Sequence, residues 1–164
     1  MTVTLSPPRR AATWWDHRTY PSHLSQVSRV RADLRTDLAG FDPDLTDTVL
    51  LCAAELAANA VRYAPDGNEF LRALALVDDH TLWLAITDQG GGTGLPRIPA
   101  QRSEDAWATA EGQRGLLLVS ALAREWGYYS LGPGNTRLGL GVWAVFAPDP
   151  ARVPTGLGRL VLTR

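Results

Sequence analysis

The chain has 164 residues, with 16 basic and 17 acidic side chains and a formal net charge of -1. This length is enough for one domain with a sizeable core. The near-neutral charge argues against a general binder of nucleic acid or anionic membranes, because non-specific phosphate affinity comes from uncompensated basic residues. All the basic residues are Arg, so no lysine is available to hold a phosphate group.

The cysteine content and the apolar pattern predict a soluble cytoplasmic protein. Cys52 is the only cysteine, so no disulfide can form within the chain. No stretch approaches the ~18 apolar residues of a membrane helix, and polar residues follow Arg9-Arg10 before a signal-peptide apolar region develops. Three scattered histidines lack the spacing of zinc ligands, so no zinc site is expected.

The N-terminal region is expected to contain a loose lead-in, an edge strand and an amphipathic helix. We expect the lead-in at residues 1–12, a single domain at 13–147 and a tail at 148–164. Residues 11–20, which include Trp14 and Trp15, suggest an edge strand. Apolar residues then recur at steps of three and four, which predicts a helix over residues 22–40. These apolar residues are Leu24, Val27, Val30, Leu34 and Leu38.

A second helix is predicted over residues 43–64, because Asp42-Pro43-Asp44 supplies an N-cap, a proline suited to the first turn and an acid near the positive helix end. Its apolar side consists of Leu45, Val49, Ala53, Leu56 and Ala60. Two antiparallel strands are expected next, at residues 70–77 and 81–87.

The rest of the chain is expected to complete an α+β fold. Residues 88–111 are rich in glycine and proline and predict a long loop, with a short helix suggested at 103–110. A helix at 115–124 and a hairpin of strands at 126–131 and 138–146 follow, and a last strand at 159–163 is left open. Together these elements predict a two-layer sandwich, with a mixed, mostly antiparallel sheet of about five strands and helices on one face.

Glu55 and Asn59 are the first candidate functional pair, because residues four apart lie side by side on a helix. Arg62 and Tyr63 extend that face. Oxygen ligands suit Mg²⁺, so Asn59 with nucleotide phosphates is a plausible metal shell, and Glu55 would be left to orient a hydroxyl or water. A solvated helix surface is the more common explanation of such a pair.

Two glycine-rich segments are the other candidates. Asp88 directly follows a strand and precedes Gly90-Gly91-Gly92, so its carboxylate could accept from an exocyclic amino group while the glycines allow close approach of a flat ligand. A flexible turn explains this segment equally well. Residues 111–116 place glycines at a helix start, where unpaired amides and Arg114 could bind an anion, although an ordinary helix start is the alternative. Neither segment is a P-loop or a dinucleotide fingerprint.

The order of these three motifs resembles the Bergerat-fold ATPases shared by gyrase-type and histidine-kinase-type proteins. Within that group the chain is similar to the bacterial anti-sigma-factor serine/threonine kinases, in particular the stand-alone ATP-binding regulators of actinomycetes. The resemblance covers about residues 13–147. The motifs are the N box Glu55-Leu56-Ala57-Ala58-Asn59-Ala60-Val61-Arg62, the first glycine box Asp88-Gln89-Gly90-Gly91-Gly92 and the second glycine box Gln113-Arg114-Gly115-Leu116-Leu117-Leu118-Val119.

The resemblance implies a role for each matched position, with ATP and Mg²⁺ as cofactors. Asn59 would ligate Mg²⁺, Glu55 would act as catalytic base toward a protein serine or threonine, and Asp88 would bind the adenine amino group. The implied nucleotide contacts are Asn59, Arg62, Asp88, Gly90, Gly92, Gly112, Arg114, Gly115 and Leu116. The implied partners are a sigma factor and an anti-anti-sigma antagonist, with no direct contact to nucleic acid or membrane, and a homodimer is an open alternative.

Two departures from the family pattern bear on activity. Tyr63 stands where relatives often have His, and Gly141 stands where they usually have Thr, so a hydroxyl that helps to bind adenine is absent. Weaker nucleotide affinity, or a water in place of the hydroxyl, is expected. A non-catalytic module whose partner binding responds to ATP, and a domain that has lost nucleotide binding, are therefore the alternatives to a kinase.

Overall fold

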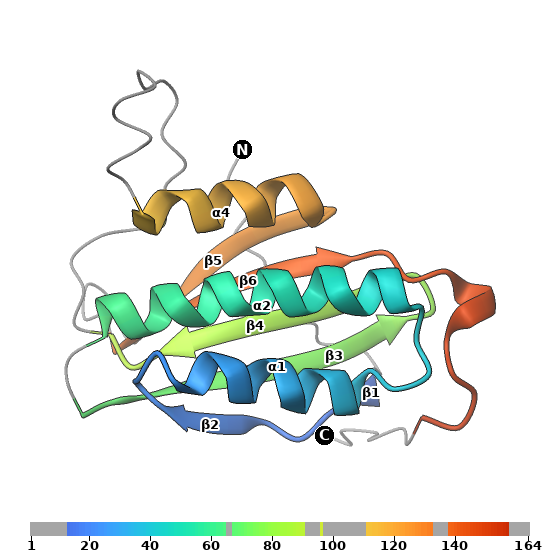
Figure 1. The fold of residues 1–164 in the computed structure, drawn as a ribbon, viewed down its shortest axis with the longest axis horizontal. Helices are drawn as coiled ribbons and strands as arrows, with labels where there is room; N and C mark the ends of the chain where they lie inside the picture. The colour runs from blue at the N-terminus through green and yellow to red at the C-terminus, as the bar shows by residue number, and fades with distance from the viewer. Residues whose placement is uncertain (1–12, 65–66, 91–95, 97–110, 133–137, 158–164) are drawn as a thin grey trace.

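The computed structural model describes residues 13–64, 67–90, 96, 111–132 and 138–157. Figure 1 shows two layers, with the helices on one face of a twisted sheet. None of the helices in the described part of the chain has the length and apolar character that crossing a bilayer would require. The suggested helix at 103–110 and the open strand at 159–163 lie outside the described residues.

The described sheet has six strands in place of the expected five, and each of its pairs is antiparallel. Its order is β1-β3-β4-β6-β5, with β2 also on β3. The strands are β1 Thr13–Trp14, β2 Arg18–Pro21, β3 Glu69–Asp78, β4 Thr81–Asp88, β5 Glu125–Leu131 and β6 Gly139–Phe146. The α+β sandwich predicted from the sequence is confirmed.

The additional strand arises because the expected edge strand is interrupted. Trp14 pairs with Ala75 and Arg18 pairs with Arg72, so four steps along the edge oppose three steps along β3. One extra residue must therefore bulge out between β1 and β2. Both short strands lie along the same edge of β3, which explains why one continuous strand was predicted.

In the part of the chain that the structure describes, three helices cover one face of the sheet: α1 Gln26–Asp37, α2 Pro43–Tyr63 and α4 Glu111–Leu122. A short 3-10 helix, η1 Pro150–Arg152, follows β6. The expected first helix was too long, because Leu24 precedes α1 and is 60% exposed. Asp42 is the N-cap of α2 by position, but its carboxylate accepts from Arg152 Nη1 at 2.6 Å instead of capping the helix.

Alternation along the strands divides the buried apolar side chains between two faces. On the helix side, Leu74, Leu84 and Ala144 pack against α2 residues such as Val49 and Leu56 in the main core. The opposite side carries a second cluster, which we call the far-face cluster. It consists of Ala73, Ala75, Trp83, Ala85, Trp143 and Val145.

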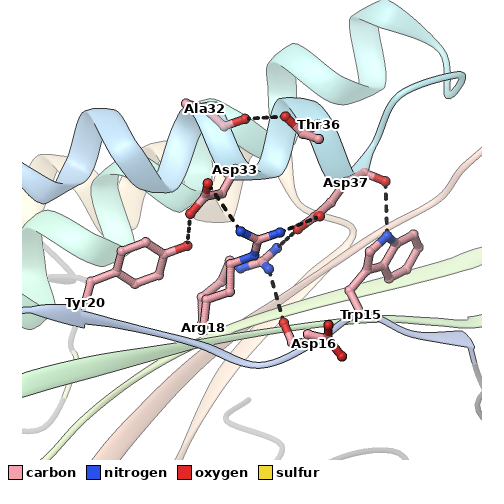
Figure 2. A network of polar contacts seen from close by, with 9 residues as sticks. Trp15, Asp16, Arg18, Tyr20, Ala32, Asp33, Thr36 and Asp37 are labelled. Atoms are coloured by element: carbon pink, nitrogen blue, oxygen red, sulfur yellow. Dashed lines mark hydrogen bonds and ion pairs between the residues drawn. The ribbon is translucent and has the colours of Figure 1, made fainter.

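A network of charged side chains joins α1 to the edge strands and to β3 (Figure 2). Arg72 is fully buried on the helix side of β3, and its Nη1 lies 2.6 Å from Asp37 Oδ2 in an ion pair without hydrogen-bond geometry. Arg18 Nη2 donates to Asp37 Oδ1 at 3.3 Å, and Arg18 Nη1 lies 3.4 Å from Asp33 Oδ1. Tyr20 Oη donates to Asp33 Oδ2 at 2.9 Å. These contacts hold α1 over the sheet edge.

Candidate functional site

The three motifs meet at one end of the molecule. Figure 1 shows four chain ends together at the left of the view, at one end of the sheet. They are the C-terminal end of α2, the N-terminal end of α4, the end of β4 and the start of β6. Antiparallel pairing of β4 with β6 brings Asp88 opposite Leu140, although 52 residues separate them. The fold therefore gathers residues from four separate elements into one candidate site.

Asp88 is the last residue of β4, and its carboxylate is held by the backbone. Its Oδ1 accepts from the amide of Gly90 at 2.8 Å and from the amide of Leu140 at 3.1 Å. Gly90 has φ +78°, a conformation that glycine adopts without strain. Within the described residues no hydrogen bond reaches Oδ2, so one carboxylate oxygen is fixed while the other can accept from a ligand.

Gly139 is a site residue that the sequence analysis missed. A Cβ at this position would lie 2.5 Å from the backbone oxygen of Asp88 and 3.3 Å from Leu131 Cδ1. Only glycine therefore fits beside the end of β4. The available signal was the Gly-Leu-Gly segment at the start of a predicted strand, since glycine inside a strand often marks a close backbone approach.

Glu55 and Gly115 bring the N box and the second glycine box into direct contact. Glu55 lies on α2 and Gly115 lies on α4, and a Cβ at Gly115 would stand 2.6 Å from Glu55 Oε2 and 3.3 Å from Glu55 Cβ. Any larger residue at this position would have to displace the Glu55 carboxylate. The carboxylate that the sequence predicts to be catalytic is thus placed beside the first turns of α4.

Asn59 lies one helical turn beyond Glu55 and contacts Arg62. The Arg62 guanidinium donates to Asn59 Oδ1 at 3.2 Å, which is the oxygen expected to ligate a metal ion. Tyr63 is 55% exposed at the end of the same helix. Asn59 and Arg62 therefore lie together on the side of α2 that the sequence predicted, and a cation bound to Asn59 Oδ1 would lie beside the Arg62 guanidinium.

The second glycine box differs from expectation in the position of its helix start. The described helix α4, Glu111–Leu122, already includes the four residues before Gly115, where the sequence predicted the helix to start. Gly112, Arg114 and Gly115 therefore all lie within the described part of α4. Leu116 is buried in the main core, so its side chain is not available to a ligand. Gly92 lies outside the described residues.

Gly141 faces Tyr129. A Cβ at Gly141 would fall on the Tyr129 ring, whose hydroxyl lies 2.8 Å from the hydroxyl of Thr87. Burial raises the pKa of Tyr129, and the hydrogen bond with Thr87 partly opposes this shift. The space that a threonine side chain would fill at this position is therefore taken by Tyr129, on the strand next to β6.

The motifs that resemble an ATPase site thus occupy neighbouring positions in the fold. The structure is similar to that of a mycobacterial sensor histidine kinase, MprB, with a TM-score of 0.49 and 18% identity over 81% of this chain and 99% of that chain. No curated protein matches the sequence. The model of the histidine kinase-like ATPase domain family matches residues 19–141. Because this match covers most of the chain, the protein belongs to the family of histidine kinase-like ATPase domains.

Proposed function

We propose that the protein is an ATP- and Mg²⁺-dependent anti-sigma-factor serine/threonine kinase, which phosphorylates an anti-anti-sigma antagonist. Membership of the histidine kinase-like ATPase domain family implies ATP binding. The observation that carries the kinase proposal is the contact between Glu55 and Gly115, because it places a carboxylate beside the glycine box. The motif order that resembles anti-sigma kinases gives the substrate class.

The end of β4 suits the adenine base. Asp88 Oδ1 is held by two backbone amides, which leaves Oδ2 to accept from the exocyclic amino group of adenine. Gly90 adopts φ +78° two residues after this carboxylate, and Gly139 allows β6 to approach the backbone of Asp88 closely. Gly92 belongs to the same glycine box and is proposed to line the base as well.

The residues of α2 and α4 suit a metal-bound triphosphate. Asn59 offers an amide oxygen of the kind that Mg²⁺ prefers, and the ion would neutralise charge on the phosphates. Gly112 and Arg114 lie toward the N-terminal end of α4, where the helix dipole favours anions. Gly115 and Leu116 follow in that helix. The chain has no lysine, and these groups together with Arg62 are proposed to bind the phosphates.

In the proposed reaction a serine or threonine hydroxyl of the antagonist attacks the γ-phosphorus of ATP. The new P–O bond forms as the bond to the β-phosphate oxygen breaks, ADP leaves, and Glu55 accepts the hydroxyl proton. Phosphoryl transfer depends mainly on positioning and charge neutralisation, so these few groups are sufficient. A sigma factor is the second proposed partner, released when the antagonist competes, and the setting is cytoplasmic.

A phosphotransfer assay tests this proposal. The chain is incubated with γ-labelled ATP, Mg²⁺ and candidate antagonist proteins, and label is measured on serine and threonine. Glu55→Gln should abolish transfer while ATP binding is retained, and Glu125→Gln, on an exposed part of β5, serves as the matched control. Absence of label on every antagonist, or equal activity of Glu55→Gln and the wild type, would contradict the kinase assignment.

A non-catalytic module that binds partners in response to ATP is the second candidate function. It is favoured by the bond from Arg62 to Asn59 Oδ1, because a guanidinium on that oxygen opposes metal binding. In this case ATP binds without turnover and changes the affinity for a protein partner. Equal partner affinity with and without ATP would exclude this function.

A further inference from the structure

Tyr129 and Thr87 form a side-chain bridge across three strands of the sheet. Tyr129 on β5 and Thr87 on β4 both pair with Gly141 on β6, the strand that lies between them. Their hydroxyl oxygens are 2.8 Å apart, within hydrogen-bond distance. Because β4 and β5 are two strand spacings apart, about 10 Å, the tyrosine side chain must pass over Gly141 to reach Thr87.

Gly141 provides the space for this bridge. A Cβ built at position 141 would overlap the Tyr129 ring, so the ring lies directly over the backbone of β6. A side chain at this position would push the ring away and break its contact with Thr87. The glycine on β6 and the tyrosine on β5 therefore depend on each other.

The bridge lies on the opposite face of the sheet from the side chain of Asp88. Ala85 belongs to the far-face cluster, whereas Ile86 belongs to the main core on the helix side. Since side chains alternate along a strand, Thr87 faces the far side and Asp88 faces the helix side. Position 141 pairs with Thr87, so it faces away from the candidate adenine site. Gly141 thus makes room for the bridge and does not leave a gap beside the base.

We propose that Tyr129 is a positioning residue for the Asp88 carboxylate and acts through Thr87. This inference rests on the proposed function, because it gives Tyr129 a part in adenine recognition. Thr87 directly precedes Asp88, which is the last residue of β4. The hydroxyl bridge holds this strand end from the far face, while the amides of Gly90 and Leu140 hold Asp88 Oδ1. Together these contacts fix the direction of Oδ2, the oxygen that is offered to the adenine amino group.

The position of Asp88 Oδ2 matters only for a ligand that carries the amino group. ATP donates to this oxygen in the proposed site, whereas purine riboside 5′-triphosphate has a hydrogen in place of the amino group and cannot make this bond. A displaced Oδ2 weakens the binding of ATP alone, while a general loss of packing weakens the binding of both nucleotides. The ratio of the two dissociation constants therefore separates positioning from stability.

Substitutions that remove one hydroxyl of the bridge test the inference. Tyr129→Phe removes the hydroxyl and keeps the ring over Gly141. In calorimetric titrations with Mg²⁺, its dissociation constant for ATP should rise by about 3–10-fold, and that for purine riboside 5′-triphosphate should not change. Thr87→Val should have the same effect, and the conservative Thr87→Ser should keep the wild-type ratio. Combining Tyr129→Phe with Thr87→Val should add no further loss, because both remove one hydrogen bond.

Tyr20→Phe is the matched control for the loss of a buried tyrosine hydroxyl. This hydroxyl donates to Asp33 at 2.9 Å, and Tyr20 lies on β2 beside β3, away from β5. The control should keep the wild-type ratio of dissociation constants. Equal losses for both nucleotides in Tyr129→Phe, or no loss for either, would overturn the inference. A wild type that binds ATP no more tightly than purine riboside 5′-triphosphate would contradict the proposed role of Asp88 itself, and the inference with it.

Discussion

Asp37→Asn is expected to destabilise the fold strongly, because it removes the counter-charge of a fully buried arginine. Arg72 has no exposed surface, and its Nη1 lies 2.6 Å from Asp37 Oδ2. Its Nε has no hydrogen-bond partner in the described structure, so the Asp37 carboxylate supplies much of the compensation for burying the charge. Breaking a buried pair by removing one partner typically costs about 3–5 kcal/mol of unfolding free energy.

The matched control is Asp33→Asn on the same helix. Asp33 pairs with Arg18, whose side chain is 40% exposed, so solvent screens this interaction. An asparagine can still accept the hydrogen bond from Tyr20, and a loss of no more than about 1 kcal/mol is expected. The double variant Arg72→Met with Asp37→Asn should recover most of the stability that Asp37→Asn loses, since the buried charge is then absent.

Urea unfolding followed by far-UV circular dichroism measures these differences, provided that the slope of free energy against urea is similar in all variants. The double-mutant cycle then gives the coupling between positions 37 and 72. A loss below about 1 kcal/mol for Asp37→Asn, or strictly additive effects in the cycle, would refute the claim that this ion pair holds α1 on the sheet.

Three further predictions follow from single contacts. Gly115→Ala should leave the helix content intact but lower phosphotransfer by about 10–100-fold, because a Cβ there displaces the Glu55 carboxylate; unchanged activity would contradict the proposed site packing. Burial raises the pKa of Tyr20 from 10.0 to about 12, so stability contributed by the neutral hydroxyl is present below pH 10 and lost as pH rises toward 12. Tyr20→Phe should flatten the pH dependence of the unfolding free energy in that window, and an unchanged curve would exclude this titration. Gly141→Thr should lower the unfolding free energy by about 1–3 kcal/mol through a clash with Tyr129, and Tyr129→Ala should relieve much of that loss.

The helix α2 shows what local sequence signals can predict. Its start at Pro43 and its buried residues Val49, Ala53 and Leu56 agree with the expected cap and apolar side. The carboxylate of Asp42 nevertheless bonds Arg152, a residue from the C-terminal part of the chain. A cap position is encoded locally, whereas the partner of its side chain depends on tertiary packing.

The edge strands and the buried ion pair could not be predicted from local patterns. Residues 11–20 were predicted as one strand because the bulge between β1 and β2 is defined only by pairing with β3. Arg72 occupies a core-facing position between Phe70 and Leu74 that a strand pattern assigns to an apolar residue. The core can hold this arginine because Asp37, on α1 and distant in the sequence, pairs with it.

The candidate site was predicted in its residue types but not in its contacts. Glu55, Asn59 and Asp88 were identified from motif spacing, and the fold brings their elements to one end of the sheet. The amide of Leu140 was not identified as a partner of Asp88, because strand pairing between β4 and β6 creates that contact. Motifs therefore indicate the chemistry, while the sheet topology determines which backbone groups complete it.

Calorimetric titration of the full chain with ATP and Mg²⁺ tests the central claim most directly. Saturable binding is predicted for the wild type. In Asp88→Asn the side-chain oxygen would still accept from the Gly90 and Leu140 amides, so the NH₂ group would face the adenine amino group. Two donors would then oppose each other, and the affinity for ATP should fall by about 10–100-fold. Absence of binding heat for the wild type, or equal affinity of the two proteins, would contradict the assignment of this end of the sheet as an ATP site.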